Sequence, residues 1–228
     1  MEVCLQNLAA VNDPATRREL TPDYPFGGKR PLISNDWYPT FNRANVALVT
    51  DPIARITADA GVTADGTARK ADTIILATGF DTTRFLSAIP IAGRGGQRLD
   101  ETWSVAPEAY LGITVSGFPN LFMLYGPNTI HGSIIFQIEC QVDYLLRHIC
   151  RMNAQDLAWI NVKPAAMAAF NRQLQSDLDQ VEVWNSGSCR DDYRGPSGRI
   201  VAQWPHGMDR YRDITRSDDG AAFETYPG

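Results

Sequence analysis

The residues best suited to cofactor chemistry lie at two glycine turns, each directly after a short hydrophobic run. The first run, residues 74–76, leads at once into Ala77, Thr78 and Gly79. A run without polar alternation is typical of a strand buried on both faces of a parallel sheet. Ligands of open α/β sheets bind outside the carboxyl ends of such strands, where small residues let the backbone approach them. The turn is a candidate cofactor contact, although an ordinary buried strand ending in a turn glycine has the same pattern.

The second turn follows the hydrophobic run 121–125, and its four residues are Gly126, Pro127, Asn128 and Thr129. Ser133 can then cap a helix from Ile134 to about residue 152. The first N–H groups of such a helix are free and lie at its positive end, which favours a polar cofactor edge or an anion. A plain strand–helix connection is the alternative. The apolar residues of this helix share one broad face: Ile134, Ile135, Ile138, Val142, Leu145, Leu146 and Ile149.

The remaining patterns predict short elements that position these turns. Helices are expected at residues 3–11, from Asp13-Pro14 and from Pro164, and strands at 45–49, 53–57 and 157–162. Residues 62–70 predict a hairpin about Asp65-Gly66. The glycine-rich residues 92–97 are interpreted as a surface turn, because no apolar helix follows them. A proline- and glycine-rich loop at 21–31 carries two adjacent cations, Lys29 and Arg30.

Composition narrows the function classes. The chain has 228 residues, a net charge of −5 and no cluster of basic residues, which argues against nucleic acid and anionic membranes as partners. No apolar run approaches a membrane span, and the start of the sequence does not have the pattern of a secretory signal. The four cysteines lack metal-ligand spacing, so we expect no metal site and reduced thiols in a cytoplasmic protein: Cys4, Cys140, Cys150 and Cys189.

Taken together, the motifs resemble the carboxyl-terminal part of Baeyer–Villiger and flavin-containing monooxygenases. The resemblance extends over residues 12–212 and rests on the order of KRPL at 29–32, YPTFNR at 38–43, ILATGFD at 75–81, YLGI at 110–113, FPNLF at 118–122 and GPN at 126–128. It implies an α/β fold with parallel strands and a hairpin insert, which is part of a pair of Rossmann-like dinucleotide-binding domains. It further implies a remnant helix and loop at 1–28, the end of the NADPH-binding domain at 29–75, part of the FAD-binding domain at 76–216, and a frayed tail at 217–228.

The resemblance also implies a chemistry. NADPH reduces FAD, O2 adds at the flavin C4a atom, and the resulting peroxide inserts one oxygen into a ketone or onto a nitrogen or sulfur atom. Arg30 would be the catalytic residue, since a permanent cation stabilises the developing negative charge. Lys29 would assist with the NADPH phosphate or the flavin, and residues 77–79 would pass close to the cofactors. The 126–129 turn and the Ile134 N–H would face the pyrimidine edge of the flavin.

The sequence departs from the family in ways that leave other functions open. It contains no GxGxxG motif after a strand and no FxGxxxHxxxW fingerprint, so the part that grips both pyrophosphates is absent. One alternative is therefore a truncated, non-catalytic fragment or interaction module, and another is an oxygenase acting on nitrogen or sulfur. A disulfide reductase-like flavoprotein fits less well, because the chain has no CxxC motif. If the family function holds, we expect a missing amino-terminal half to act in trans.

Overall fold

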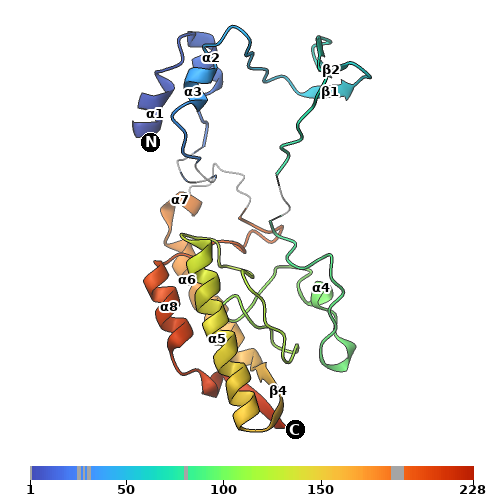
Figure 1. Ribbon diagram of the computed structural model, residues 1–228, viewed down its shortest axis with the longest axis vertical. Coiled ribbons are helices and arrows are strands. Elements are labelled where there is room, and N and C mark those ends of the chain that lie inside the picture. Colours follow the sequence, from blue (N-terminus) through green and yellow to red (C-terminus); the bar gives the residue numbers. More distant parts are fainter. Residues whose placement is uncertain (1, 25–26, 28, 30–31, 80–81, 186–192) are drawn as a thin grey trace. The chain divides into compact units, whose positions relative to one another are not determined.

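The computed structural model describes residues 2–24, 27, 29, 32–79, 82–185 and 193–228. By its internal contacts the chain divides into two units, residues 1–80 and residues 81–228. Figure 1 labels most of their elements, and each unit is described by itself.

The first unit begins with short helices. α1 spans Glu2–Leu8 and α2 spans Pro14–Glu19, both at predicted positions, whereas α3, which spans Trp37–Thr40, was not predicted. The predicted cap of α2 is confirmed, since the Asp13 carboxylate accepts a hydrogen bond of 2.7 Å from the Thr16 N–H. Asn42, just after α3, donates to the Ala10 carbonyl at 2.6 Å and accepts from the Asn12 N–H at 2.8 Å. This amide joins the three helices.

The sheet of the first unit is the predicted hairpin with one added strand. β1 (Ile53–Ile56), β2 (Ala60–Thr63) and β3 (Ala68–Lys70) pair antiparallel in that order. In the β2–β3 turn, the Asp65 carboxylate accepts from the Thr63 hydroxyl at 2.6 Å and from the Thr67 N–H at 3.0 Å. These hydrogen bonds, with that of Thr63 the largest cause, lower the pKa of Asp65 to about 2.

Two strands predicted for the first unit are wrong. Residues 45–49 and 74–76 have no strand structure, and Ile75 keeps 86% of its surface exposed. A strand of the interior type is stable only when neighbouring strands satisfy its N–H and C=O groups and cover both faces. No described segment pairs with either run, so the apolar side chains stay in solvent.

The second unit contains the long elements. α5 spans Ile134–Ala154, β4 spans Leu157–Val162 and α6 spans Pro164–Asp179, all close to the predicted bounds. The 3-10 turn η1 (Arg94–Gly96) occupies the predicted surface turn. The remaining elements are α4 (Leu99–Thr102), α7 (Glu182–Asn185), α8 (Met208–Arg216), η2 (Gly220–Ala222) and β5 (Phe223–Pro227).

The sheets correct the predicted fold class, because all paired strands among the described residues are antiparallel rather than parallel. β4 pairs antiparallel with β5, so the prediction of a frayed tail at 217–228 is wrong. Phe223 is buried and the Trp159 ring stacks on Tyr226 with a centroid distance of 5.6 Å, which fixes the polar tail. The predicted strand at 121–125 is also wrong: this segment is irregular, although Met123 lies in the core. Of the predicted fold class, the mixture of helices and strands and the hairpin are confirmed, and the parallel strands are not.

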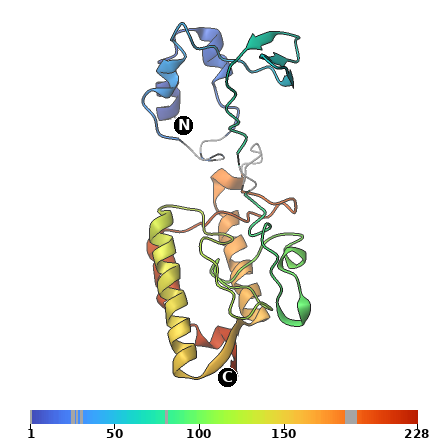
Figure 2. The ribbon, with the colours of Figure 1, turned by 45° about the vertical axis from the view of Figure 1, so that its right-hand side comes forward.

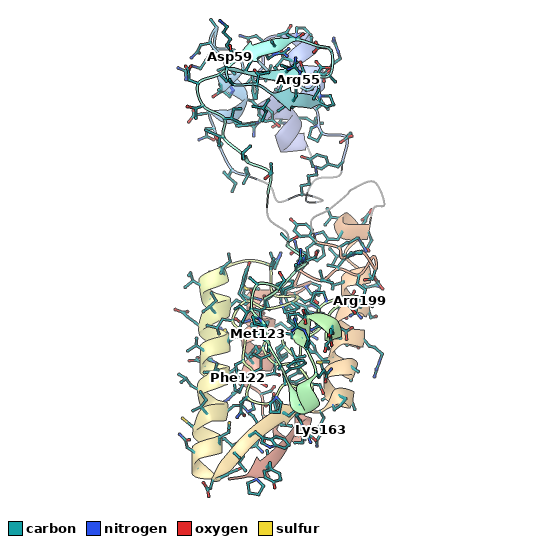
Figure 3. The ribbon with its side chains drawn as sticks, turned by 90° about the vertical axis from the view of Figure 1, so that its right-hand side faces the viewer. Arg55, Asp59, Phe122, Met123, Lys163 and Arg199 are labelled. Atoms are coloured by element: carbon teal, nitrogen blue, oxygen red, sulfur yellow. The ribbon has the colours of Figure 1, made fainter. Side chains whose placement is uncertain are left out.

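The core of the second unit lies between its long helices. Figure 2 shows α5 and α6 on either side of the irregular segment that precedes α5. Leu111 and Ile113 of that segment pack with Tyr144 of α5 and with Ile160 and Val162 of β4. Phe122 and Met123 of the same segment lie in the interior of this unit (Figure 3). The irregular segment that precedes α5 is therefore held in place by packing in the core, although it forms no strand.

α5 turns an unexpected face to that core. Its buried residues are largely polar: Gln137, Cys140, Gln141, Tyr144 and His148. By contrast, Ile135, Leu146 and Ile149 of the predicted apolar face are exposed. Among the helices that the structure describes, α5 included, none is long and apolar enough to cross a bilayer.

Candidate functional site

The 126–129 turn is fixed to a distant segment through Asn128. The side-chain Nδ2 of Asn128 donates to the carbonyls of Ile200 and Gln203, at 2.9 and 3.0 Å. Its backbone N–H donates to the Val201 carbonyl at 2.9 Å. Asn128 has a φ of +57°, a left-handed conformation that asparagine tolerates better than most residues. The asparagine thus shapes the turn and ties it to residues 200–203.

Two glycines allow a second turn to pack against the first. A Cβ atom on Gly112 would lie 2.2 Å from Cγ2 of Thr129, and one on Gly126 would lie 2.4 Å from the Gly112 carbonyl oxygen. Both distances are below van der Waals contact, so only glycine fits at either position. Thr129 is fully buried, and its hydroxyl donates to the Gly126 carbonyl at 2.6 Å. The turn is therefore rigid before any ligand binds.

A buried hydrogen-bond relay connects the turn to α5 and α8. The Tyr125 N–H donates to Oε1 of Gln141 at 2.7 Å, and Nε2 of Gln141 donates to the Tyr211 hydroxyl at 2.8 Å. That hydroxyl donates in turn to the Leu111 carbonyl at 2.7 Å. Burial raises the pKa of Tyr211, so the phenol keeps its proton and the relay keeps its direction at neutral pH. The relay thus links the residue before the 126–129 turn, Tyr125, to Leu111, which precedes Gly112 of the second turn.

The start of α5 has free hydrogen-bonding capacity beside the turn. The predicted cap is confirmed, since Ser133 Oγ accepts from the Phe136 N–H at 3.3 Å. The backbone N–H of Ile134 has no acceptor among the described residues. One turn later, Gln137 is fully buried, and neither its Oε1 nor its Nε2 has a hydrogen-bond partner within the described part of the chain. Because Gln137 has no exposed surface, its amide is an unpaired polar group in the interior of the second unit, and the free capacity of this helix start is the Ile134 N–H.

The other predicted site residues belong to the first unit. Ala77, Thr78 and Gly79 are exposed, and Gly79 has a φ of +83° that favours glycine. The Nζ atom of Lys29 lies 4.9 Å from the centroid of the Tyr24 ring. Arg30 lies outside the described residues. The predicted residues 126–129 and Ile134 thus belong to the second unit, and Lys29 and residues 77–79 belong to the first.

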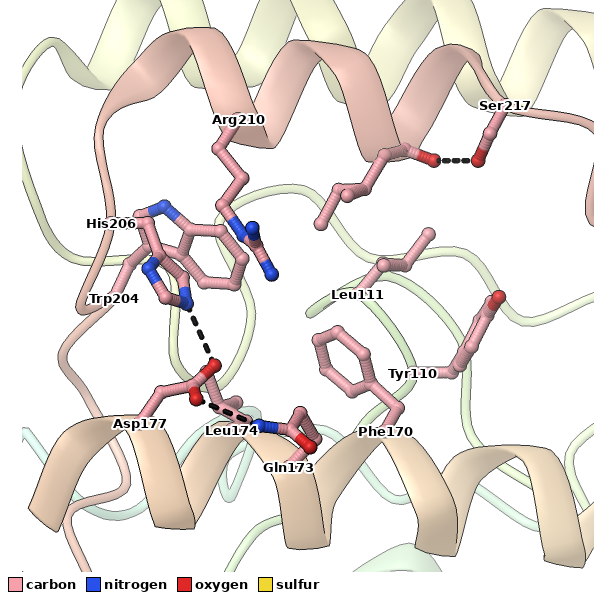
Figure 4. Close-up of a pocket in the computed structure, with 11 residues that line it drawn as sticks. Tyr110, Leu111, Phe170, Gln173, Leu174, Asp177, Trp204, His206, Arg210 and Ser217 are labelled. Carbon is pink, nitrogen blue, oxygen red and sulfur yellow. Dashed lines mark hydrogen bonds and ion pairs between the residues drawn. The ribbon is translucent and has the colours of Figure 1, made fainter.

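A cavity of about 270 Å³ in the second unit was not predicted from the sequence (Figure 4). His206 Nε2 lies 2.8 Å from Oδ2 of Asp177, which also accepts from Gln173 Nε2 at 2.8 Å through its other oxygen. The Arg210 side chain points toward this group, and Leu111, Phe170 and Leu174 provide an apolar wall. Asp177 and His206 are 29 residues apart and share no motif, so the sequence offers no signal for this pair.

A second polar cluster lies where α5 approaches the turn before β5. The Asp219 carboxylate accepts from the Tyr144 hydroxyl at 2.5 Å and lies 3.4 Å from His148 Nε2. Burial alone would raise the pKa of Asp219, but the hydrogen bonds from His148 and Tyr144 outweigh it and lower the pKa below its usual value. Burial, with Asp219 nearby, raises the pKa of Tyr110 to about 12. The cluster is a structural anchor for α5 and β5.

Comparison with known proteins agrees with the resemblance drawn from the motifs, although no family model matches the chain. A Baeyer–Villiger monooxygenase of Pseudomonas aeruginosa is 40% identical over 216 residues, which cover 93% of this chain and 41% of the relative. One of Streptomyces coelicolor is 37% identical, covering 95% and 42%. A phenazine N-monooxygenase of Lysobacter antibioticus is 42% identical, covering 95% and 41%. The chain thus spans about two-fifths of the length of these relatives.

Solved structures of monooxygenases also match nearly all of this chain and less than half of their own length. A steroid monooxygenase bound to NADP superposes with a TM-score of 0.88 and 32% identity, over 98% of this chain and 44% of that one. A cyclohexanone monooxygenase from Rhodococcus bound to NADP+ gives a TM-score of 0.85 with 29% identity, over 98% and 43%. OTEMO in complex with FAD and NADP gives 0.86 with 28% identity, over 98% and 43%.

Proposed function

Since the chain is a homologue of the Baeyer–Villiger monooxygenases over about 42% of their length, we propose that it forms the carboxyl-terminal part of an FAD- and NADPH-dependent monooxygenase. In this proposal the remaining part of the fold, including both pyrophosphate-binding motifs, comes from polypeptide outside this sequence. The complete protein inserts one oxygen atom from O2 into a ketone. The 40% identity to a Baeyer–Villiger monooxygenase is the observation that carries the proposal.

The geometry of the second unit supports a flavin at the start of α5. The rigid 126–129 turn and the free N–H of Ile134 suit an uncharged heterocycle rim that carries a hydrogen-bond acceptor. Bound FAD would supply the reaction with O2 that amino-acid side chains cannot perform. The protein's contribution is then to hold the ring edge in one orientation and to keep water away from it.

The residues of the first unit have proposed roles of a different kind. Ala77, Thr78 and Gly79 present exposed backbone without bulky side chains, so a planar cofactor can approach them closely. Lys29 carries a positive charge suited to the NADPH phosphate or the flavin. Arg30 would stabilise negative charge that develops on the substrate oxygen, because its guanidinium stays protonated at every relevant pH.

Reconstitution tests the proposal. The chain is mixed with a recombinant polypeptide that carries the remainder of the P. aeruginosa relative, FAD is added, and free FAD is removed by gel filtration. We expect the two visible absorption bands of bound flavin, and NADPH oxidation that increases when a cyclic ketone is added. A colourless complex would contradict the proposal and would favour the non-catalytic interaction module.

Oxygenation at nitrogen is a second candidate, favoured by the 42% identity to the phenazine N-monooxygenase. The cofactors and protein surfaces required are the same, so the two candidates differ only in the substrate. Mass spectrometry of the products separates them: the reconstituted complex either converts a cyclic ketone to a lactone or converts a heteroaromatic amine to its N-oxide.

A further inference from the structure

The distribution of apolar side chains on α5 carries an inference about how the chain associates. Five apolar residues lie on one face of the helix: Ile135, Ile138, Val142, Leu146 and Ile149. We call them the α5 stripe. Their spacing of three and four residues places them in one line along the helix. The exposed fractions of Ile135, Leu146 and Ile149 are 68%, 50% and 39%.

The opposite face of α5 already has its partners within the second unit. Gln141 bonds to Tyr125 and Tyr211, and Tyr144 bonds to Asp219. Cys140 packs in a core cluster with Leu174, Trp204 and Tyr211. α5 therefore buries a largely polar face and exposes an apolar one, which reverses the usual arrangement of a surface helix. Since the buried face is held by specific hydrogen bonds, the helix cannot simply rotate to hide the stripe.

Exposed apolar surface of this length marks an interaction site. We propose that the α5 stripe is the docking surface for the portion of a Baeyer–Villiger-type monooxygenase chain that this sequence does not contain, through a complementary apolar face of that portion. The inference rests on the proposed function for the identity of the partner. The observation that selects this partner is the coverage: the match spans 93% of this chain but only 41% of the P. aeruginosa relative. Most of that protein is thus available to cover the stripe.

One further feature agrees with this partner. Leu124, two residues before the 126–129 turn, is 47% exposed, so apolar surface of this unit also lies beside the proposed flavin contact.

Binding measurements without FAD test the inference. The probe is the recombinant remainder of the P. aeruginosa relative, and the dissociation constant for the full chain is measured by calorimetry. Leu146→Asp and Ile135→Asp each place a charge in the stripe, and each should weaken binding about 30-fold, as loss of an interface hot spot does. Leu146→Met, which keeps the apolar surface, should bind like the original chain. Val105→Asp changes a residue that is 70% exposed but lies outside α5, and it should have no effect.

Several outcomes would overturn the inference. They are absence of binding by the original chain, no effect of the two aspartate variants, or an equal effect of Val105→Asp. Sedimentation of the chain alone addresses a second copy as the occupant: a dimer that Leu146→Asp abolishes would also overturn the inference. We expect the variants to fold, because the substituted side chains are exposed, and circular dichroism checks this. A complex that forms through the stripe but retains no FAD would refute the proposed function and leave this inference standing.

Discussion

Removal of a single hydroxyl group tests the relay that holds the candidate flavin turn. Tyr211→Phe keeps the ring in its place, where it packs edge-on against Trp204 with a centroid distance of 5.2 Å. It removes the hydroxyl that joins Gln141 to the Leu111 carbonyl. Nε2 of Gln141 then loses its acceptor and the Leu111 carbonyl loses its donor, both in the interior. The variant therefore isolates the relay from the hydrophobic packing around it.

The magnitude follows from the two groups that lose their hydrogen bond. Each such group costs about 1–3 kcal/mol when buried, so at the lower end of that range the two together lower the free energy of unfolding by about 2–3 kcal/mol. For a unit of this size, that loss lowers the melting temperature by about 5–10 °C. Because Gln141 also accepts from the Tyr125 N–H, the backbone leading into the 126–129 turn should become more mobile.

Urea unfolding followed by tryptophan fluorescence measures the first effect, and amide exchange at Tyr125, Gly126, Asn128 and Thr129 measures the second. Tyr226→Phe is the matched control, since Tyr226 is 57% exposed and its hydroxyl has no partner among the described residues. Its effect should stay within about 0.5 kcal/mol. If Tyr211→Phe is no more destabilising than this control, the relay does not hold the turn and the reasoning is refuted.

Three further predictions address the packing, the pH dependence and the helix cap. Gly112→Ala should lower the free energy of unfolding by more than about 3 kcal/mol, because the new Cβ would collide with Thr129. Gly198 also has a left-handed backbone but lies in open space, so Gly198→Ala should cost about 1 kcal/mol, and thermal melts of both variants check this difference. The pKa of Asp219 is lowered in the folded state, so the stability contributed by its carboxylate is complete above the unfolded pKa of about 3.9 and is lost as the pH falls through the lower, folded pKa. In unfolding measured from pH 6 to pH 2, Asp219→Asn should be less stable than the original chain at pH 6 and should lose less stability on acidification. Ser133→Ala removes the cap of α5 and should cost about 1 kcal/mol in the same urea assay, and an unchanged midpoint would contradict the capping role.

Local signals in the sequence were sufficient for the elements that depend on neighbouring residues. Asp13 and Ser133 marked the starts of α2 and α5, Asp65-Gly66 marked the hairpin, and Pro164 marked the start of α6. Each of these signals acts through hydrogen bonds or backbone angles within a few residues. The ends of these elements could therefore be located from the neighbouring residues alone.

Predictions that depend on distant residues failed. The runs at 45–49, 74–76 and 121–125 have the composition of interior strands, but no described segment pairs with them. β5 was missed because its polar sequence is fixed by pairing with β4, which lies some 60 residues earlier. The buried face of α5 was missed for a related reason: Gln141 and Tyr144 are buried through specific partners, which hydropathy does not detect.

The candidate site also contains residues found from local signals and residues that depend on distant parts of the chain. The 126–129 turn and Ile134 could be found from the order of hydrophobic run, glycine and cap residue. The anchors of that turn, Gln141, Tyr211 and residues 200–203, could not, because they come from three separate parts of the chain. The placement of Arg30 stays a prediction, since it lies outside the described residues.

The proposed function requires the 126–129 turn and the start of α5 to hold the edge of a flavin. Hydrogen–deuterium exchange of the reconstituted complex, with and without FAD, examines this contact at single segments. We expect FAD to slow exchange at the amides of Ile134 and Ile135 and at those of Thr78 and Gly79, while β3 is unchanged. FAD that binds to the complex with no protection at Ile134 would contradict the proposed contact.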